Sequence, residues 1–216
     1  FVNEVETKHP FKSKMSTEVS SMFKALAPYA PFGLRFLFGN LWLFKPLLTA
    51  LMPSISAQAG AMLKTTVAFT MQSGSKAYNV IPQQATLGAN MRFIPHQGEK
   101  QSIEIIRKLA QRHGLETEVI HSNDYTVPAD IKGEAFKLME NVIEQTFPGL
   151  PSSPYIMTGA TDAQFFQPVC KNCLRFSPVI YGPEQMKGMH GINECIEYNC
   201  LPGAVRFYKN LIKAPK

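Results

Sequence analysis

Two segments near the middle of the chain alternate between apolar and polar positions, as strands with one buried face do. The first, residues 63–71, groups five side chains on one face: Leu63, Thr65, Val67, Phe69 and Met71. The second, residues 84–94, groups another five: Ala85, Leu87, Ala89, Met91 and Phe93. Asn90 and Arg92 then share the opposite face of the second strand. Because residues two apart on a strand point the same way, the spacing predicts that this strand presents both polar groups together.

The residues that follow change to a helical period. Ile103, Ile106 and Leu109 lie on one stripe, and Gly114 is suited to end the helix. A short strand is predicted over residues 116–121. The order strand, strand, helix, strand predicts a small α+β sandwich.

The sequence changes character near residue 124, where we place a domain boundary. Asp130 is a candidate N-cap for a helix whose apolar stripe ends at Val142 and Ile143. Short buried strands are predicted over 155–157 and 173–180, and Pro202 suits the first turn of a last helix. Six residues of that helix are predicted to face inward: Leu201, Ala204, Val205, Tyr208, Leu211 and Ile212. This alternation of helix and strand in residues 125–216 is typical of a three-layer α/β domain.

Residues 31–52 form the most apolar part of the chain. Arg35, Asn40, Lys45 and Pro46 interrupt it, so no run approaches the roughly 20 apolar residues of a membrane span. Four interpretations stay open for residues 32–52. The segment contacts a membrane surface, lines an acyl-chain pocket, packs against a partner subunit, or belongs to the core.

The formal net charge of +6 is unevenly placed, because no acidic residue lies between Glu18 and Glu99. Six basic residues fall in that stretch: Lys24, Arg35, Lys45, Lys64, Lys76 and Arg92. A basic stretch without acids favours an anionic partner, either a substrate with a carboxylate or a membrane surface. The basic residues are too widely spaced for a nucleic-acid interface, so we expect no nucleic-acid partner.

We predict that the four cysteines are reduced, structural residues and not the ligands of a zinc knuckle. Cys170 and Cys173 have the C-x2-C spacing of a zinc ribbon, but Cys195 and Cys200 do not. Four cysteines in 216 residues also argue against a disulfide framework, and with no visible signal segment they indicate a cytoplasmic protein. Because the chain begins with Phe1, we expect it to be an internal-to-C-terminal part of a longer protein.

Two short motifs carry candidate chemistry. Residues 158–163 read Thr-Gly-Ala-Thr-Asp-Ala, a turn of small residues whose backbone N–H groups can approach an anion closely. Residues 190–194 read His-Gly-Ile-Asn-Glu, which places a loop histidine four residues before a carboxylate. That pairing suits a metal-ligating imidazole held by a second group.

Together with Asn79-Val-Ile-Pro82 and Asn90-Met-Arg92, these motifs resemble the M20 family of dizinc peptidases and amidohydrolases. The likeness covers residues 63–213 and is strongest to the carboxypeptidase S and N-acyl-amino-acid hydrolase branch. It implies that residues 1–124 are most of an α+β lid through which the protein forms a homodimer. Residues 125–216 would be the C-terminal part of a three-layer α/β zinc-hydrolase domain. The implied activity is hydrolysis of a peptide or N-acyl-amino-acid amide bond next to a free carboxylate, with two zinc ions per site.

The resemblance also assigns roles to single residues. His190 matches the last zinc ligand of the family, and Glu194 anchors its loop. Arg92 matches the lid arginine that holds the substrate carboxylate, a role suited to a planar cation, with Asn79 and Asn90 supporting that pocket. The simpler alternative for Arg92 is an ordinary surface arginine.

The small-residue turn receives roles in the same way. Gly159, Ala160 and Thr161 match the turn that lines the substrate site, and Ala160 stands where the family often has glycine. Asp162 would orient the loop from behind it. A simple helix N-cap is the alternative for Asp162.

The resemblance is incomplete in one respect. The family's other zinc ligands, its general base and its oxyanion histidine are all expected upstream of Phe1, and no segment of this sequence replaces them. One ligand cannot hold two zinc ions, so the chain by itself is expected to be inactive. The alternative function is a non-catalytic dimerisation or binding module derived from such an enzyme.

Overall fold

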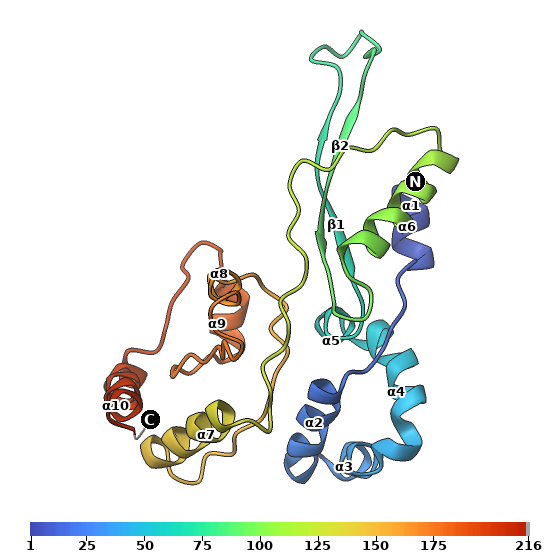
Figure 1. Cartoon of the computed structure of the whole chain (residues 1–216). Coiled ribbons are helices and arrows are strands. Elements are labelled where there is room, and N and C mark those ends of the chain that lie inside the picture. Colours follow the sequence, from blue (N-terminus) through green and yellow to red (C-terminus); the bar gives the residue numbers. More distant parts are fainter. Residues whose placement is uncertain (215–216) are drawn as a thin grey trace. The chain divides into compact units, whose positions relative to one another are not determined.

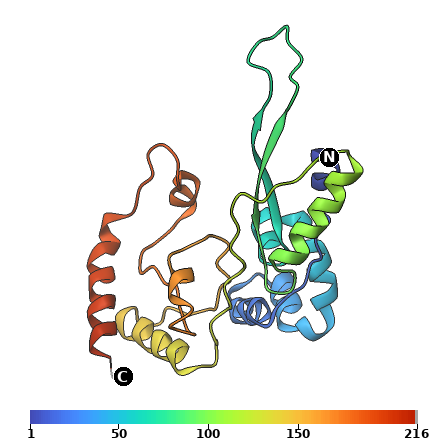
Figure 2. The same cartoon turned by 45° about the horizontal axis from the view of Figure 1, so that its top comes forward.

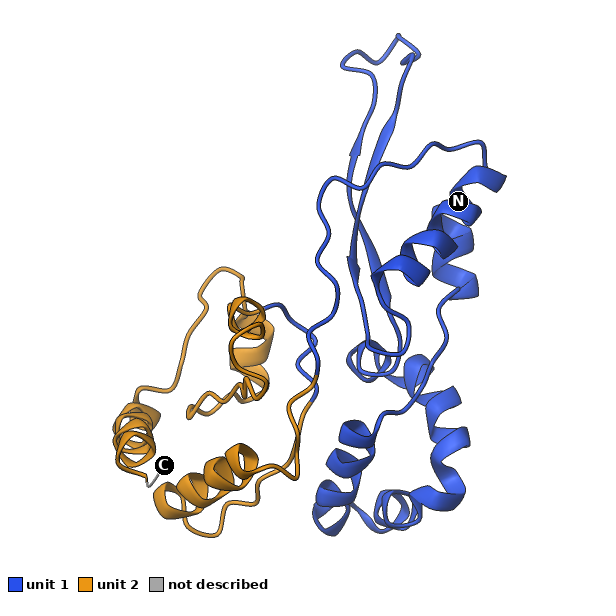
Figure 3. Cartoon of the chain, in the orientation of Figure 1, with its two compact units in different colours: residues 1–127, 156–160 blue, residues 128–155, 161–216 orange. Residues whose placement is uncertain are grey.

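The computed structural model describes residues 1–214, which divide into two compact units (Figure 3). Unit 1 consists of residues 1–127 together with 156–160. Unit 2 consists of residues 128–155 and the chain from residue 161 onward. Helices and strands are both present, which is consistent with the predicted α/β class.

The helical part of unit 1 surrounds one apolar core. Its elements are α2 Thr17–Leu26, the 3-10 turn η1 Ala27–Tyr29, α3 Phe32–Gly39, α4 Leu41–Ile55 and α5 Ala57–Ala61 (Figure 1). The first helix, α1 Val2–Lys8, contributes no residue to this core. Ser16 begins α2 by accepting the Val19 N–H at 3.2 Å, as an N-cap does. The rings of Phe23 and Phe38 lie 4.8 Å apart in this core, and Ile156 packs against it. The returning segment 156–160 is therefore held by apolar packing.

A two-stranded antiparallel hairpin extends from this core, formed by β1 Thr66–Ser73 and β2 Thr86–Arg92 (Figures 1 and 2). Both strands lie within the predicted segments except at Gln72 and Ser73. On β1, Phe69 pairs with Ala89 while Met71 pairs with Gly88, so the register skips one residue. Such a bulge moves Met71 to the opposite face from Phe69. The prediction of one continuous face from Leu63 to Met71 is therefore wrong at its end.

A buried polar cluster ties the N-terminal segment, β1 and the next helix together. The helix is α6 Glu99–Arg112. The carbonyl oxygen of Gln97 accepts hydrogen bonds from Thr65 Oγ1 at 3.0 Å and Ser102 Oγ at 2.8 Å, and the Gln97 side chain accepts the Lys12 N–H at 2.9 Å. Thr65 and Ser102 are fully buried. Satisfied polar groups of this kind stabilise one arrangement of the elements that carry them.

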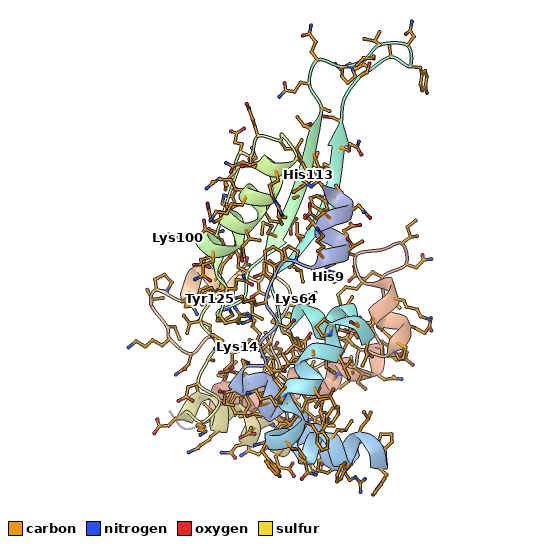
Figure 4. The ribbon with its side chains drawn as sticks, turned by 90° about the vertical axis from the view of Figure 1, so that its right-hand side faces the viewer. His9, Lys14, Lys64, Lys100, His113 and Tyr125 are labelled. Carbon is orange, nitrogen blue, oxygen red and sulfur yellow. The ribbon has the colours of Figure 1, made fainter. Side chains whose placement is uncertain are left out.

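Helices α1 and α6 also contact each other through charge. Glu4 accepts from His113 Nε2 at 2.6 Å, and it pairs with Lys8 at 2.9 Å and Arg112 at 3.3 Å. These groups hold the pKa of Glu4 down at about 2, with the His113 hydrogen bond as the largest cause and Lys8 next. His113 lies beside α1 in Figure 4. The first helix of the chain is thus fixed to the end of α6.

Unit 2 is built on two helices, α7 Glu134–Thr146 and α10 Leu201–Lys213. Smaller elements lie between them: α8 Ala163–Phe166, α9 Pro183–Gly188 and the 3-10 turn η2 Tyr198–Cys200. Phe207 of α10 is buried with Val142 and Ile143 of α7. Asn210 Nδ2 donates to Thr146 Oγ1 at 3.0 Å. Pro202 lies in the first turn of α10, as predicted.

The inward face predicted for α10 is largely wrong. The buried residue is Phe207, while Leu201, Val205, Tyr208 and Ile212 are exposed. Gly203 lies on the side of α10 that faces the end of α7. A Cβ atom at Gly203 would come within 2.9 Å of the ring of Phe147, which directly follows α7. Only Leu211 of the predicted set packs against the α7 cluster.

Three predicted strands are absent from the part of the chain that the structure describes. Residues 116–121, 155–157 and 173–180 are extended or irregular, without strand pairing. A strand needs a hydrogen-bonded neighbour, and none of these segments has one within residues 1–214. The third strand of the predicted sandwich is therefore missing here.

The predicted cap of α7 is also wrong. Gly133 occupies the N-cap position, and Asp130 forms a turn before it by accepting the Lys132 N–H at 2.9 Å. An aspartate that bonds its own backbone two residues on favours a turn over a helix start at that position.

No single helix within residues 1–214 is long and apolar enough to cross a membrane. Helices α3 and α4 meet the length and composition criteria only as a pair, and the pair is bent by 110°.

Candidate functional site

Arg92 ends β2 and contacts the small-residue turn. Its Nη1 donates to the carbonyl oxygen of Thr158 at 3.4 Å. Both residues belong to unit 1, where Ile156 fixes the returning segment against the core. Within the described chain Arg92 makes no ion pair and no second side-chain hydrogen bond. The exposed guanidinium therefore has N–H groups left to bind a carboxylate in a planar, two-point manner.

Asn90 lies two residues before Arg92 on the same strand. The two pair with Ala68 and Thr66 on β1, and the register between them is regular. Their side chains therefore share a face, about 7 Å apart along the strand. The structure thus brings Asn90 to Arg92 as the alternation predicted.

Asn79 is not brought to the same place. It lies in the loop between Ser73 and Thr86, at the far end of the hairpin from the Thr66 and Arg92 pair (Figure 1). A role for Asn79 beside Arg92 has no support in this arrangement.

The small-residue turn is divided between the units. Thr158, Gly159 and Ala160 belong to unit 1, while Thr161 and Asp162 belong to unit 2. In unit 2, Thr161 Oγ1 accepts from Arg175 Nε at 2.8 Å. No pattern in the sequence predicted this partner, because both residues lie in irregular segments.

Asp162 occupies the N-cap position of α8 without capping it. Its backbone is helical, with φ −61° and ψ −13°, and its side chain makes no cap hydrogen bond. A capping side chain normally needs an extended backbone at that position. The carboxylate of Asp162 is therefore not used to start the helix.

His190 lies in a tight turn after α9 and is exposed. Its φ is 60°, in the left-handed region that residues other than glycine seldom occupy. Its backbone N–H donates to Glu194 Oε2 at 3.1 Å, and Asn193 between them also has a positive φ of 65°. Strained backbone of this kind persists where the surroundings fix it and is frequent at functional sites. Within residues 1–214 the imidazole makes no hydrogen bond, so both ring nitrogens are available.

The described residues do not by themselves form a metal centre. Nowhere in residues 1–214 do three or more His, Cys, Asp or Glu side chains converge. A zinc site requires about four ligands, and a pair of ions requires more. His190 could supply one of them, and its donor chemistry is suitable, but a two-zinc site does not fit this set of residues alone.

All four cysteines are free thiols. Cys173 Sγ lies 3.2 Å from the Cys170 carbonyl oxygen. Loss of hydration, and then the neighbouring Cys170, raise the pKa of the Cys173 thiol.

Comparison with known proteins decides the family. The model of peptidase family M20/M25/M40 matches residues 10–214. The chain belongs to this family. The predicted M20 membership is thereby confirmed, and with it a place among hydrolases and peptidases that are generally metal-dependent.

The M20 chain is similar in sequence to several eukaryotic proteins. It is 31% identical over 193 residues to N-fatty-acyl-amino acid synthase/hydrolase PM20D1 of Xenopus tropicalis, covering 89% of this chain and 38% of the relative. The human protein of the same name is 28% identical over 201 residues, covering 92% and 40%. Probable carboxypeptidase S-like 2 of Dictyostelium discoideum is 29% identical over 180 residues, covering 83% and 34%.

These relatives support the carboxypeptidase S and N-acyl-amino-acid hydrolase branch. The M20 chain spans well under half of their length. No solved structure gives a significant match.

Proposed function

We propose that this M20 chain is part of a metal-dependent hydrolase that cleaves a peptide or N-acyl-amino-acid amide bond next to a free carboxylate. The contact of Arg92 with Thr158 is the main support, because it sets a cation with unused N–H groups beside the turn that lines the substrate site in the resemblance. No acidic residue between 19 and 98 competes for that cation in sequence. The relatives named for N-acyl-amino acids and for carboxypeptidase favour the same substrates.

In this proposal the residues of the chain divide the work. Arg92 binds the substrate carboxylate, and Asn90 supports it from the same face of β2. Gly159, Ala160 and Thr161 line the site. No role at this site is proposed for Asn79, which lies at the far end of the hairpin.

His190 is proposed as one ligand of a two-zinc centre. Its free imidazole, its left-handed backbone and its bond to Glu194 suit that role, since a ligand is best held by its neighbours. Asp162 would orient the small-residue turn without contacting the substrate itself. The remaining ligands and the general base would come from residues outside this chain, so the chain alone would not hydrolyse substrate.

Residues 1–124 are proposed to be most of the lid that forms a homodimer, and residues 125–216 the C-terminal part of the catalytic domain. The cytoplasm remains the proposed compartment. Residues 32–52, which form α3 and most of α4, add an apolar surface for an acyl chain of the substrate or for a membrane.

A matched pair of substrates tests the proposed reaction. An N-acyl amino acid and its carboxamide would be given to the zinc-loaded protein that contains this chain. We expect cleavage of the acid to be faster because only the acid has a carboxylate for Arg92. Equal rates for the two compounds would contradict the assignment of Arg92 and the proposed preference.

A second function is favoured by the lack of a ligand cluster in residues 1–214: a non-catalytic dimerisation or binding module. Light scattering on the zinc-free chain separates the two. A stable dimer supports the module. Aggregation supports the enzyme part, because apolar surface that a larger protein would cover is then exposed.

A further inference from the structure

Helices α3 and α4 expose an unusually apolar surface. Along α4, large side chains four residues apart are exposed in one stripe: Leu43, Leu47, Leu51 and Ile55. Trp42 precedes Leu43 on α4, about 100° round the helix from it, and is 82% exposed; Phe32 at the start of α3 is 85% exposed. Leu41 and Leu48 on the other side of α4 are buried in the unit 1 core. The helices are therefore anchored by one face and apolar on the other, which marks an interaction surface.

The charged residues of the two helices themselves are all basic. No acidic residue occurs from 19 to 98, and Arg35 and Lys45 lie on the two helices themselves. Lys45 and Lys14 line an open hollow of about 660 Å³ with Trp42 and Pro46. Neither lysine makes an ion pair with any residue in the range 1–214. Figure 4 labels Lys14 on the segment that leads into α2.

The geometry excludes a span and suits an interface. The 8 residues of α3 and 15 residues of α4 are about 12 and 22 Å long, shorter than the roughly 30 Å hydrocarbon core. The bend of 110° between them prevents one straight crossing. Segments that lie in the membrane interface are typically short helices with an exposed apolar face and cations beside it. They often carry a tryptophan, as α4 does in Trp42, because the indole is apolar but has one polar N–H.

We propose that the exposed face of α3 and α4 binds the surface of a membrane that contains anionic lipids. The apolar stripe enters the headgroup and acyl boundary, while Lys14 and Lys45 contact lipid phosphates or carboxylates. The basic residues on α3, on α4 and in the hollow beside Trp42 favour this partner over an ordinary protein surface, because an anionic bilayer offers negative charge over a wide area. The inference rests on the proposed function in one respect: it decides between the acyl chain and the membrane that were proposed there for residues 32–52.

Trp42 is the only tryptophan of the chain and therefore reports on this surface directly. The test adds vesicles of phosphatidylcholine, with or without phosphatidylserine, to the 216-residue chain and records tryptophan emission and acrylamide quenching. We expect a blue shift and protection from quenching with phosphatidylserine, a smaller effect without it, and weakening by salt. Unchanged emission with both vesicles would overturn the proposal.

Two other occupants give different results. A blue shift that grows with protein concentration in the absence of vesicles would assign the surface to a second copy of the chain. An equal shift with a soluble short-chain N-acyl amino acid alone would assign it to the substrate acyl group. Either result would overturn membrane binding.

Variants locate the contact. Lys45→Gln is expected to weaken binding to phosphatidylserine vesicles about fivefold, and Leu47→Ser with Leu51→Ser at least about tenfold. Lys76→Gln and Ile81→Ser, in the exposed hairpin loop, are matched controls that should change nothing. Circular dichroism checks that each variant is folded. Equal losses in variants and controls would overturn the assignment to α3 and α4.

Discussion

The two candidate functional regions are held in place in different ways. Arg92 contacts Thr158 across 66 residues of sequence; Ile156 holds the Thr158 end against the core of unit 1, and the pairing of Arg92 with Thr66 holds the other end. His190 in unit 2 is held only by Glu194, four residues later, and by the strained turn between them. A carboxylate-binding residue can work from one prepared position, whereas a metal ligand needs several partners at once. The difference suggests that this chain carries a nearly prepared substrate-binding part and one isolated piece of a metal site.

The largest effect is expected from His190→Ala, which tests His190 as a zinc ligand in the zinc-loaded protein that contains this chain. We expect the activity to fall more than about 100-fold, together with loss of bound zinc, because a ligand should matter more than its supporting groups. Metal content by elemental analysis is the readout, and His121→Ala, which lies in the irregular segment before unit 2, is the control. Full zinc occupancy in His190→Ala would remove His190 from the metal site.

The substrate half is tested by Arg92→Ala in the same protein. We expect KM for an N-acyl amino acid to rise about 10- to 100-fold, since a hydrogen bond to a charged group contributes about 1.5–3 kcal/mol. Arg92→Lys should restore part of the loss, because lysine keeps the charge without the planar donor geometry. Steady-state kinetics with the acid and its carboxamide give the comparison. A variant that loses the same factor on both compounds would show that Arg92 acts on the fold and not on the carboxylate.

Ser102→Ala should destabilise unit 1, which carries Arg92, by weakening the buried polar cluster around Gln97. The change removes the fully buried hydroxyl that bonds the Gln97 carbonyl, so the free energy of unfolding should fall by about 1–3 kcal/mol. Urea unfolding followed by circular dichroism measures it. Ser75→Ala in the exposed hairpin loop is the control, and equal stability of the two variants would contradict a structural role for the buried cluster.

A smaller effect is expected from pH. The pKa of Glu4 is lowered from 4.5 to about 2, so its contribution to stability is fully present above about pH 4.5 and is lost as pH falls through about 2. Thermal unfolding of the wild-type chain and Glu4→Gln should therefore converge over that range. Glu6→Gln, on the same helix but without an ion pair in the described chain, is the control. A constant difference between wild type and Glu4→Gln down to pH 2 would show that the Glu4 contacts do not stabilise the fold.

Local patterns predicted the elements that depend on nearby residues. The alternation of β2 and its pair Asn90 and Arg92, the stripe of α6 and the proline at the start of α10 are all present. The bulge at Met71, the unpaired strands and the buried face of α10 were missed. Each of these is decided by a residue or strand distant in sequence, such as Gly88 opposite Met71 or Phe147 against Gly203.

The same limit applies to the candidate site. The residue types and their spacing singled out Arg92 and His190 as candidates, and the family resemblance supplied their proposed roles. The contact of Arg92 with the Thr158 carbonyl, which joins β2 to a segment 66 residues later, and that of Arg175 with Thr161, which joins two irregular segments, had no sequence signal. Only the folded chain could also show that Asn79 lies at the wrong end of the hairpin for a shared pocket.

The most direct test of this account is zinc binding by the 216-residue chain, measured by equilibrium dialysis with His190→Ala as the reference. The account predicts no stoichiometric zinc in either protein, because the described residues offer one isolated ligand and no cluster. Two zinc ions bound per wild-type chain would contradict it and would place a complete metal centre within these residues.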